Sequence, residues 1–208
     1  ERGNSIATRN ARLAAVHSLF TYAAVQHPEH AGSISRVLAI PAKRRQRRTD
    51  ITYLTDPEVT ALLNAPDQGT PAGRRDHALL QVAVTTGLRV SELTGLRVGD
   101  VHLGTGAHVL AHGKGRKDRS TPLDHASVTV LRDLLGDTMT NRDRYVFTTR
   151  TGTRMSRDAV AVRLTLHATT AALTCPTLTG KNLTPHVLRH TAAMRLLAAG
   201  VDSTVIAL

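Results

Sequence analysis

Residues 184–200 are a helix-forming segment near the end of the chain, with basic side chains in its first turns. Thr184 is a suitable N-cap, and Pro185 suits the first helical position, where an N–H would be unpaired in any case. Gly200 is a typical C-terminal stop. These features predict a helix over residues 185–199. Leucine and alanine recur at helical spacing and predict its buried stripe: Leu188, Ala192, Leu196 and Ala199.

His186, Arg189 and His190 fall in the first turn and a half of this helix, where residues three and four apart share a face. The guanidinium of Arg189 is a rigid fork of donors that suits phosphate, and the free N–H groups of the helix start add positive potential. The alternative is a solvated basic helix end. This segment alone does not decide between a phosphate site and that alternative.

A second segment, residues 85–101, places an arginine in a turn. An apolar helix over residues 76–86 is expected to end at Gly87, and Arg89 begins a shorter helix with Glu92 three residues later. An unpaired buried charge is unfavourable, so Glu92 could be the structural partner of Arg89; a functional role for Glu92 is the alternative. Arg89 lies at the mouth of the turn and can point outward. The helix is expected to bury one side: Ala78, Leu79, Val82, Ala83 and Thr86.

The third segment, residues 109–123, has an alternating start, a Gly-rich basic tip and a short extended run. This pattern predicts a β-hairpin. Lys114 lies at the tip between two glycines, which permit close approach to a ligand. A lysine there can reach a phosphate and protonate a leaving oxygen, whereas the alternative is a solvated loop.

The three segments together, in this order and at this separation, resemble the tyrosine recombinase or phage integrase family over roughly residues 55–208. Residues 86–92 resemble the first family box and 113–119 the hairpin, while residues 186–190 resemble the His-x-x-Arg-His box. The resemblance implies four catalytic residues: Arg89, Lys114, His186 and Arg189. It implies supporting roles for Glu92 and His190.

The resemblance also implies a reaction, phosphoryl transfer without a metal. A tyrosine attacks the scissile phosphate of DNA and a 5′-hydroxyl leaves. Arg89 and Arg189 would hold the non-bridging oxygens and stabilise the charge that develops there. Lys114 would protonate the leaving oxygen and His186 would assist proton transfer. His190 would brace the helix through a hydrogen bond.

In the family, a Leu-Gly-His motif and the nucleophilic tyrosine follow the second box. The tyrosines of this chain are Tyr22, Tyr53 and Tyr145, and none follows Arg189. We therefore expect a piece of a site-specific recombinase that is truncated at both ends, lacks its nucleophile and is inactive alone. The alternative is a non-catalytic DNA-binding remnant of a mobile-element integrase. A type IB topoisomerase shares the catalytic residues, but the spacing and the residues of these motifs resemble those of bacterial integrases.

The composition favours a polyanionic partner, because 27 Lys and Arg against 16 Asp and Glu leave a formal charge of +11. Aromatic residues make up only 2%, which disfavours stacking on single strands and favours the backbone of double-stranded DNA. No long apolar run suggests a membrane. The residues expected to contact DNA lie in the linker and the hairpin: Lys43, Arg44, Arg45, Arg47, Arg48, Arg116, Lys117 and Arg119.

No cofactor or metal is expected, because the acidic residues are scattered and two-metal nucleases need clustered carboxylates. Cys175, His186 and His190 could mimic zinc ligands, but further ligands at suitable spacing are missing. The single cysteine excludes an internal disulfide and fits a reducing bacterial cytoplasm, where the resemblance implies association with the nucleoid. The resemblance also implies a homo-oligomer, a synaptic tetramer on DNA.

The expected fold class is α+β and mostly helical: an integrase-like catalytic domain with a small three-stranded antiparallel sheet, preceded by part of a helical core-binding domain. We expect that part at residues 1–40, a basic linker at 41–52 and the catalytic domain at 53–208. One amphipathic helix, 5–26, should direct Ile6, Leu13, Val16, Phe20 and Ala24 to a core, and 32–40 should be irregular or a short helical turn. The remaining expected helices are 56–63, 124–135 and 156–173, with strands at 98–103, 107–112 and 120–123 and an extended piece at 145–149.

Overall fold

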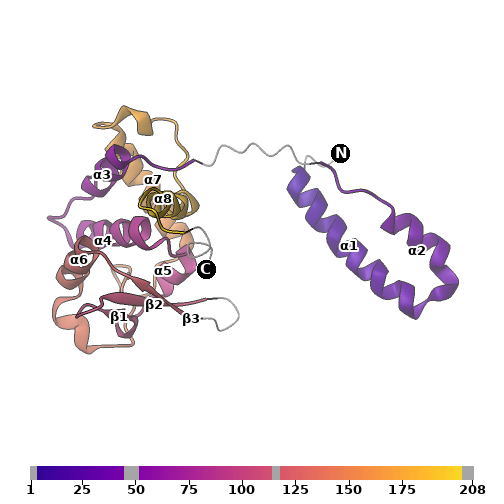
Figure 1. The fold of residues 1–208 in the computed structure, drawn as a ribbon, viewed down its shortest axis with the longest axis horizontal. Helices are drawn as coiled ribbons and strands as arrows, with labels where there is room; N and C mark the ends of the chain where they lie inside the picture. The colour runs from indigo at the N-terminus through magenta and orange to yellow at the C-terminus, as the bar shows by residue number, and fades with distance from the viewer. Residues whose placement is uncertain (1–3, 45–51, 114–117, 203–208) are drawn as a thin grey trace. The chain divides into compact units, whose positions relative to one another are not determined.

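The structure is a computed structural model that describes residues 4–44, 52–113 and 118–202. The chain divides into two compact units, Glu1–Asp50 and Ile51–Leu208 (Figure 1).

The first unit is a pair of helices joined by a 3₁₀ turn. Helix α1 spans Ile6–Gln26, the turn η1 spans Pro28–His30, and α2 spans Ala31–Leu38. The sequence prediction of irregular structure or a short helical turn at residues 32–40, and of a single helical stretch before the linker, is therefore wrong. Glycine and serine weaken the local helix propensity of α2, but the helix buries Ile34 and so gains its stability from packing.

The predicted core face of α1 is only partly correct. No residue of α1 is buried, and Ile6 and Val16 are 41% and 40% exposed. Leu13, Phe20 and Ala24 are half-buried. A pair of helices covers only part of each apolar stripe, because a stripe needs neighbours on more than one side to be removed from water.

The second unit holds six α-helices within its described residues. They are α3 (Asp56–Asn64), α4 (Pro71–Thr86), α5 (Val90–Gly95), α6 (His125–Leu135), α7 (Arg157–Ala172) and α8 (Pro185–Ala198). The helix starts predicted from capping residues are confirmed, since Asp124, Ser156 and Thr184 each accept a backbone N–H of the first turn. Helix α4 starts five residues before the predicted residue 76, because Thr70 caps it and Pro71 occupies its first position.

The sheet is small and antiparallel, in the order β1-β2-β3. Its strands are β1 (Val101–His102), β2 (His108–His112) and β3 (Asp118–Pro122). The start of the predicted strand 98–103 is wrong, because Val98–Asp100 forms the 3₁₀ turn η2, in which the Asp100 carboxylate accepts the Arg97 N–H at 2.9 Å. The α+β class, mostly helical with three antiparallel strands, is confirmed.

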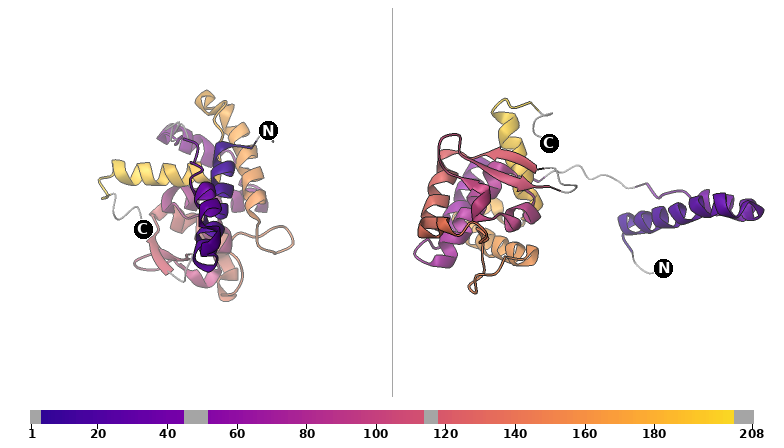
Figure 2. Two further views of the ribbon diagram at one scale, coloured as in Figure 1. Left: turned by 90° about the vertical axis from the view of Figure 1, so that its right-hand side faces the viewer. Right: turned by 90° about the horizontal axis from the view of Figure 1, so that it is seen from below.

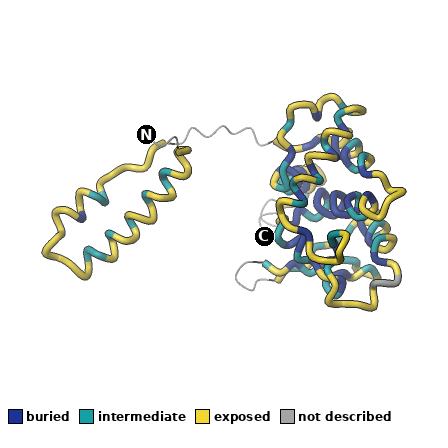
Figure 3. The backbone as a smooth tube through the Cα atoms, turned by 180° about the vertical axis from the view of Figure 1, so that it is seen from behind, coloured by how far each residue is buried: buried dark blue, intermediate teal, exposed yellow. Residues whose placement is uncertain are grey.

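Helix α4 is the centre of the second unit (Figure 3). It packs against α6 and α8, and it buries side chains around most of its circumference: Ala78, Leu79, Leu80, Val82, Ala83 and Val84. A helix that is apolar nearly all round must be covered on several sides. Arginines lie near both ends of α4: Arg74 and Arg75 at its start, and Arg89 two residues beyond Gly87.

The predicted buried stripe of α8 is half correct. Leu188 and Ala192 are buried, whereas Leu196 is 36% exposed and Ala199 is exposed. The C-terminal part of α8 extends away from the body of the unit (Figure 2), so the apolar stripe there has no neighbour in the described residues. The buried residues of α8 are instead Val187, Leu188, Thr191 and Ala192.

Candidate active site

The turn between α4 and α5 meets the first turns of α8. Gly87 ends α4 with φ of 62°, a left-handed conformation that favours glycine. A Cβ atom at Gly87 would lie 3.2 Å from the Cβ of Ala192, so α8 approaches this turn closely. Arg189 of α8 donates a hydrogen bond from Nη1 to the carbonyl of Gly87. The arginine of the His-x-x-Arg-His segment is thereby fixed to the backbone two residues before Arg89.

Glu92 is the acceptor at the centre of the site. Its Oε2 accepts the Arg89 backbone N–H at 2.7 Å, and its Oε1 accepts Arg89 Nη1 at 3.0 Å. Arg119 on β3 donates through both terminal nitrogens, Nη1 to Oε1 at 3.0 Å and Nη2 to Oε2 at 2.7 Å. The carboxylate is only 4% exposed. Burial acts to raise the pKa of Glu92, but the bonds from Arg119 and Arg89 outweigh it and hold the pKa below its usual value.

The structure thus places Arg119 on Glu92. The sequence prediction for Arg119 was a DNA contact, yet its guanidinium is engaged by the buried acid and its side chain is 24% exposed. The alternating burial of β3 turns Arg119 inward. That alternation is the one sequence signal that could have indicated the inward position.

Three arginines and one glutamate therefore meet in a small volume. Burial lowers the pKa of Arg189 first, and the positive charges of Arg89 and Arg119 lower it further, while Glu92 opposes them. The side chain of Arg89 is 55% exposed, so its guanidinium still faces solvent. The Glu92 carboxylate accepts hydrogen bonds from two arginines, so the site keeps a surplus of positive charge. An anion such as a phosphate would be stabilised there.

His186 and His190 form a pair one helical turn apart. Their Nε2 atoms lie 2.9 Å from each other, and the rings meet edge to face with centroids 4.2 Å apart. Burial, then the nearby charges of His186 and Arg189, lowers the pKa of His190. A hydrogen bond between these two nitrogens joins residues four positions apart on the same helix, and the bracing role of His190 stays a prediction.

The hairpin tip, with Lys114, Arg116 and Lys117, lies outside the described residues. Its base is described: His112 bonds Asp118 through Nδ1 at 2.9 Å and Asp100 through Nε2 at 3.2 Å. These two carboxylates, Asp118 foremost, raise the pKa of His112. The ion pairs join the ends of β2 and β3 to the turn η2, and so fix the strands from which the tip emerges.

The predicted DNA-contacting linker is described only at its start. Lys43 and Arg44 are exposed, and the backbone of Lys43 is fixed to α1, because Asn10 accepts the Lys43 N–H at 3.1 Å and donates to its carbonyl at 2.9 Å. Arg45, Arg47 and Arg48 lie outside the described residues.

The described residues contain no group of three or more His, Cys, Asp or Glu side chains that could hold a metal ion. Among the same residues, no helix has both the length and the apolar character needed to cross a bilayer. Cys175, one of the residues considered above for zinc, contacts the Thr177 hydroxyl at 3.3 Å.

Comparison with known proteins identifies the family of the chain. A sequence model described as the phage integrase family matches residues 52–207. A protein named as an integrase/recombinase, y4rC, in Sinorhizobium fredii is 51% identical over 207 residues, which is 100% of this chain and 62% of that protein. The tyrosine recombinase XerD of Pseudomonas aeruginosa is 38% identical over 158 residues, 74% of this chain and 51% of that protein. The chain thus spans less than two thirds of either relative.

Solved structures share the fold. The XerH site-specific recombinase, in a post-cleavage complex with a palindromic difH substrate, superimposes with a TM-score of 0.74 at 22% identity, over 98% of this chain and 60% of that one. The Tn1549 transposon integrase, in complex with circular intermediate DNA, gives a TM-score of 0.68 at 20% identity, over 99% of this chain and 71% of that one. At such identities the likeness is one of fold.

Proposed function

The chain belongs to the phage integrase family, and on this premise we propose that it is the phosphate-holding part of a site-specific DNA recombinase. The reaction is the breaking and rejoining of DNA strands through a phosphotyrosyl intermediate. The tyrosine oxygen forms a bond to the scissile phosphorus as the bond to the 5′-oxygen breaks, and that oxygen leaves as a hydroxyl after it takes up a proton. Rejoining is the reverse.

One observation carries the proposal: Arg189 is bonded to the Gly87 carbonyl, beside Arg89, with only the Glu92 carboxylate to balance the local arginines. Two guanidinium groups on adjoining backbone segments can each take one non-bridging oxygen of a phosphodiester. The charge that develops on these oxygens in the transition state strengthens both contacts. The arrangement therefore favours the transition state over the bound substrate.

The remaining roles follow from chemistry and position. We assign Lys114 as the acid that protonates the 5′-oxygen, because a lysine at a hairpin tip can reach a leaving group. We assign His186, whose Nε2 lies 2.9 Å from that of His190, to assist proton transfer near the attacking group. Glu92 positions Arg89. No tyrosine follows Arg189 within these 208 residues, so the proposal assigns the nucleophile to none of Tyr22, Tyr53 and Tyr145.

We assign double-stranded DNA as the partner. The formal charge of +11 supports contacts with the phosphate backbone, with residues 41–52 as a basic linker between a part of the core-binding domain at 1–40 and the catalytic domain at 53–208. Recombination joins two duplexes, so the intact protein would act as a tetramer. A protein that acts on bacterial DNA works at the nucleoid, in the cytoplasm.

The test is a duplex nicked near the cleavage point, from which the 5′-hydroxyl fragment diffuses away and traps any covalent adduct. We expect the 208-residue chain to bind this duplex and form no adduct, and a form that carries the family's tyrosine segment after Leu208 to form one, seen by denaturing electrophoresis. Replacing the leaving 5′-oxygen by sulfur should rescue Lys114→Ala, because a thiolate departs without a proton. An adduct on the 208-residue chain that is lost in Tyr145→Phe would contradict the proposal, and DNA binding without any adduct in the extended form would favour a binding-only protein.

A further inference from the structure

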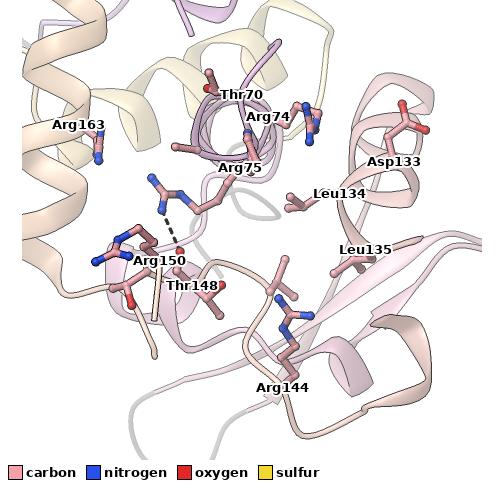
Figure 4. A pocket seen from close by; sticks show the side chains of 14 residues that line it. Thr70, Arg74, Arg75, Asp133, Leu134, Leu135, Arg144, Thr148, Arg150 and Arg163 are labelled. Carbon is pink, nitrogen blue, oxygen red and sulfur yellow. Dashed lines mark hydrogen bonds between the residues drawn. The ribbon is translucent and has the colours of Figure 1, made fainter. Parts of the chain in front are cut away.

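A second cationic site lies at the end of α4 that is remote from Arg89. A cavity of about 610 Å³ is enclosed by the first turns of α4, the end of α6, the segment 144–150 and one face of α7 (Figure 4). Arg75 lines it and lies twelve residues before Gly87 on the same helix. At the rise of an α-helix this separation is about 18 Å. The cavity is therefore distinct from the arginine cluster proposed to hold DNA.

The wall of this cavity is strongly positive. Five arginines line it against one acid, Asp133: Arg74, Arg75, Arg144, Arg150 and Arg163. Figure 4 shows Arg75, Arg150 and Arg163 directed toward a common space, although they come from α4, from the segment before Thr151 and from α7. Three like charges from three separate segments converge there.

Arg75 is held rigidly in this wall. It donates to Asp76 through Nε at 2.9 Å and through Nη2 at 2.6 Å, and its Nη1 donates to the Thr148 carbonyl at 2.9 Å. Its side chain is only 11% exposed. A guanidinium fixed in this way loses little conformational entropy when a ligand binds.

The one buried acid nearby, Asp76, pairs with Arg75 at 2.6 Å and leaves Arg144 and Arg150 without a counter-charge among the described residues. Asp76 is 3% exposed and already accepts from Arg75 and from His167, the latter at 2.9 Å. Arg163 is 3.8 Å from Asp76. Within the described parts of the chain, the guanidinium groups of Arg144 and Arg150 make no hydrogen bond and no ion pair. The positive charge of these two arginines is therefore available to a ligand.

The cavity also has an apolar wall. Leu134, Leu135 and Val146 line it, and Figure 4 shows both leucines on the α6 side, with the Arg75 guanidinium directed away from them. A bare inorganic anion would leave this wall in contact with water. A ligand with an anionic end and a flat, mostly apolar body would cover both walls, and the volume is in the range of small-molecule sites, about 300–1,000 Å³. Asp133 at the rim can accept an N–H from such a body.

We propose that this cavity binds a nucleoside di- or triphosphate. The phosphates lie on Arg75, Arg150 and Arg163, and the base packs against the two leucines. The first turn of α4 also lines the cavity and adds the positive potential of a helix N-terminus. This site is separate from the cluster of Arg89, Arg119 and Arg189. The proposal for the cavity therefore does not depend on whether the chain takes part in strand cleavage.

The experiment is a calorimetric titration of the 208-residue chain with ADP and, separately, with inorganic pyrophosphate. We expect ADP to bind more tightly than pyrophosphate. Arg150→Gln and Arg163→Gln should each weaken ADP about tenfold, as expected for the loss of a charge-assisted hydrogen bond. The matched control is Arg157→Gln, an exposed arginine of α7 outside the cavity, which should bind like the parent. Leu134→Ala should weaken ADP and leave pyrophosphate unchanged.

Several results would overturn the proposal: no ADP binding, equal affinity for ADP and pyrophosphate, or an equal loss in Arg157→Gln. Displacement of ADP by a duplex with equal effects of all three arginine variants would also overturn it, and would indicate general surface electrostatics. Thermal unfolding of each variant verifies folding, and Arg150→Gln, at an exposed position, keeps the test valid even if Leu134→Ala unfolds.

Discussion

Arg119 on β3 donates hydrogen bonds to Glu92 on α5 through both terminal nitrogens, at 3.0 and 2.7 Å, although the two residues are 27 positions apart in the sequence. The same carboxylate accepts the backbone N–H and the side chain of Arg89. The hairpin that carries Lys114 and the turn that carries Arg89 are therefore positioned by one common group. Arg89 and strand β3 thus depend on the same buried acid.

The first prediction concerns this ion pair. Arg119→Ala should lower the free energy of unfolding by about 1–3 kcal/mol, because it leaves a buried carboxylate with one of its two cationic partners. Arg119→Lys should recover only part of the loss, since a point charge cannot make two parallel bonds. Urea unfolding of the 208-residue chain measures the effect. The control is Arg157→Ala, and an equal change in both variants would contradict the role of Arg119.

The second prediction concerns Gly87. Gly87→Ala places a β-carbon in a left-handed conformation, which costs about 1 kcal/mol, and also 3.2 Å from the Ala192 side chain. Gly106→Ala is the matched control, because Gly106 has φ of 71° but open space around its Cβ position. Chemical unfolding should show the larger loss for Gly87→Ala. Similar losses would mean that the approach of α8 to this turn adds no constraint.

The helices could be predicted from the sequence because their signals are local. Thr184, Asp124 and Ser156 each cap a helix by a bond to a residue three positions later, which a linear sequence displays directly. The family motifs also indicate which residues are expected in one site. Burial of α8 could not be predicted in full, because Leu196 follows the helical pattern but lies where no described neighbour covers it.

The partners within the site could not be predicted, since they join residues distant in sequence. The Arg189 bond to Gly87 spans 102 residues, and the His167 bond to Asp76 spans 91. Arginine is a residue type expected at a DNA contact, but Arg119 lies where it bonds Glu92. Only the register of β3 against β2 decides which of these two positions the side chain takes. The cavity with five arginines gathers side chains from four segments, and periodicity carries no information about that.

The third prediction concerns acid stability. Glu58 is buried, which alone would raise its pKa, but hydrogen bonds from Lys181, the Thr55 N–H and Thr177 lower the pKa from 4.5 to about 2. A depressed folded-state pKa means that ionised Glu58 stabilises the protein above the unfolded-state pKa. This contribution is lost as the pH falls from about 5 toward 2, and amounts to about 3 kcal/mol.

Unfolding free energies measured from pH 6 to pH 2 should therefore fall less steeply in Glu58→Gln than in the parent. Asp56→Asn is the control, because Asp56 lies in the same helical turn with a side chain that is 79% exposed. The assignment is wrong if Asp56→Asn flattens the profile as much as Glu58→Gln does.

The fourth prediction concerns the linker. Replacement of Lys43, Arg44, Arg45, Arg47 and Arg48 by Gln should flatten the dependence of log affinity on log salt for duplex DNA. Each lost phosphate contact reduces the slope by about 0.9, because fewer counterions are released. Fluorescence anisotropy at several salt concentrations measures the slope. Single changes at Lys43 and Arg44 can be compared with Arg157→Gln. If the salt-dependence slopes of these variants do not differ, the linker is a solvated connector and not a DNA contact.

The last prediction concerns the two proposed catalytic arginines, in the form extended by a tyrosine segment. Arg89→Ala and Arg189→Ala should each slow single-turnover cleavage by about 10²–10³-fold, as expected when one donor to a developing charge is removed. Duplex affinity should change little, because many backbone contacts share the binding energy. Arg189→Lys should restore little, since lysine cannot both donate to the Gly87 carbonyl and hold the planar fork toward a phosphate. His190→Ala should lower stability before it lowers the cleavage rate. If Arg89→Ala weakens binding and leaves the cleavage step at full rate, the arginine cluster is an electrostatic surface and not a transition-state clamp.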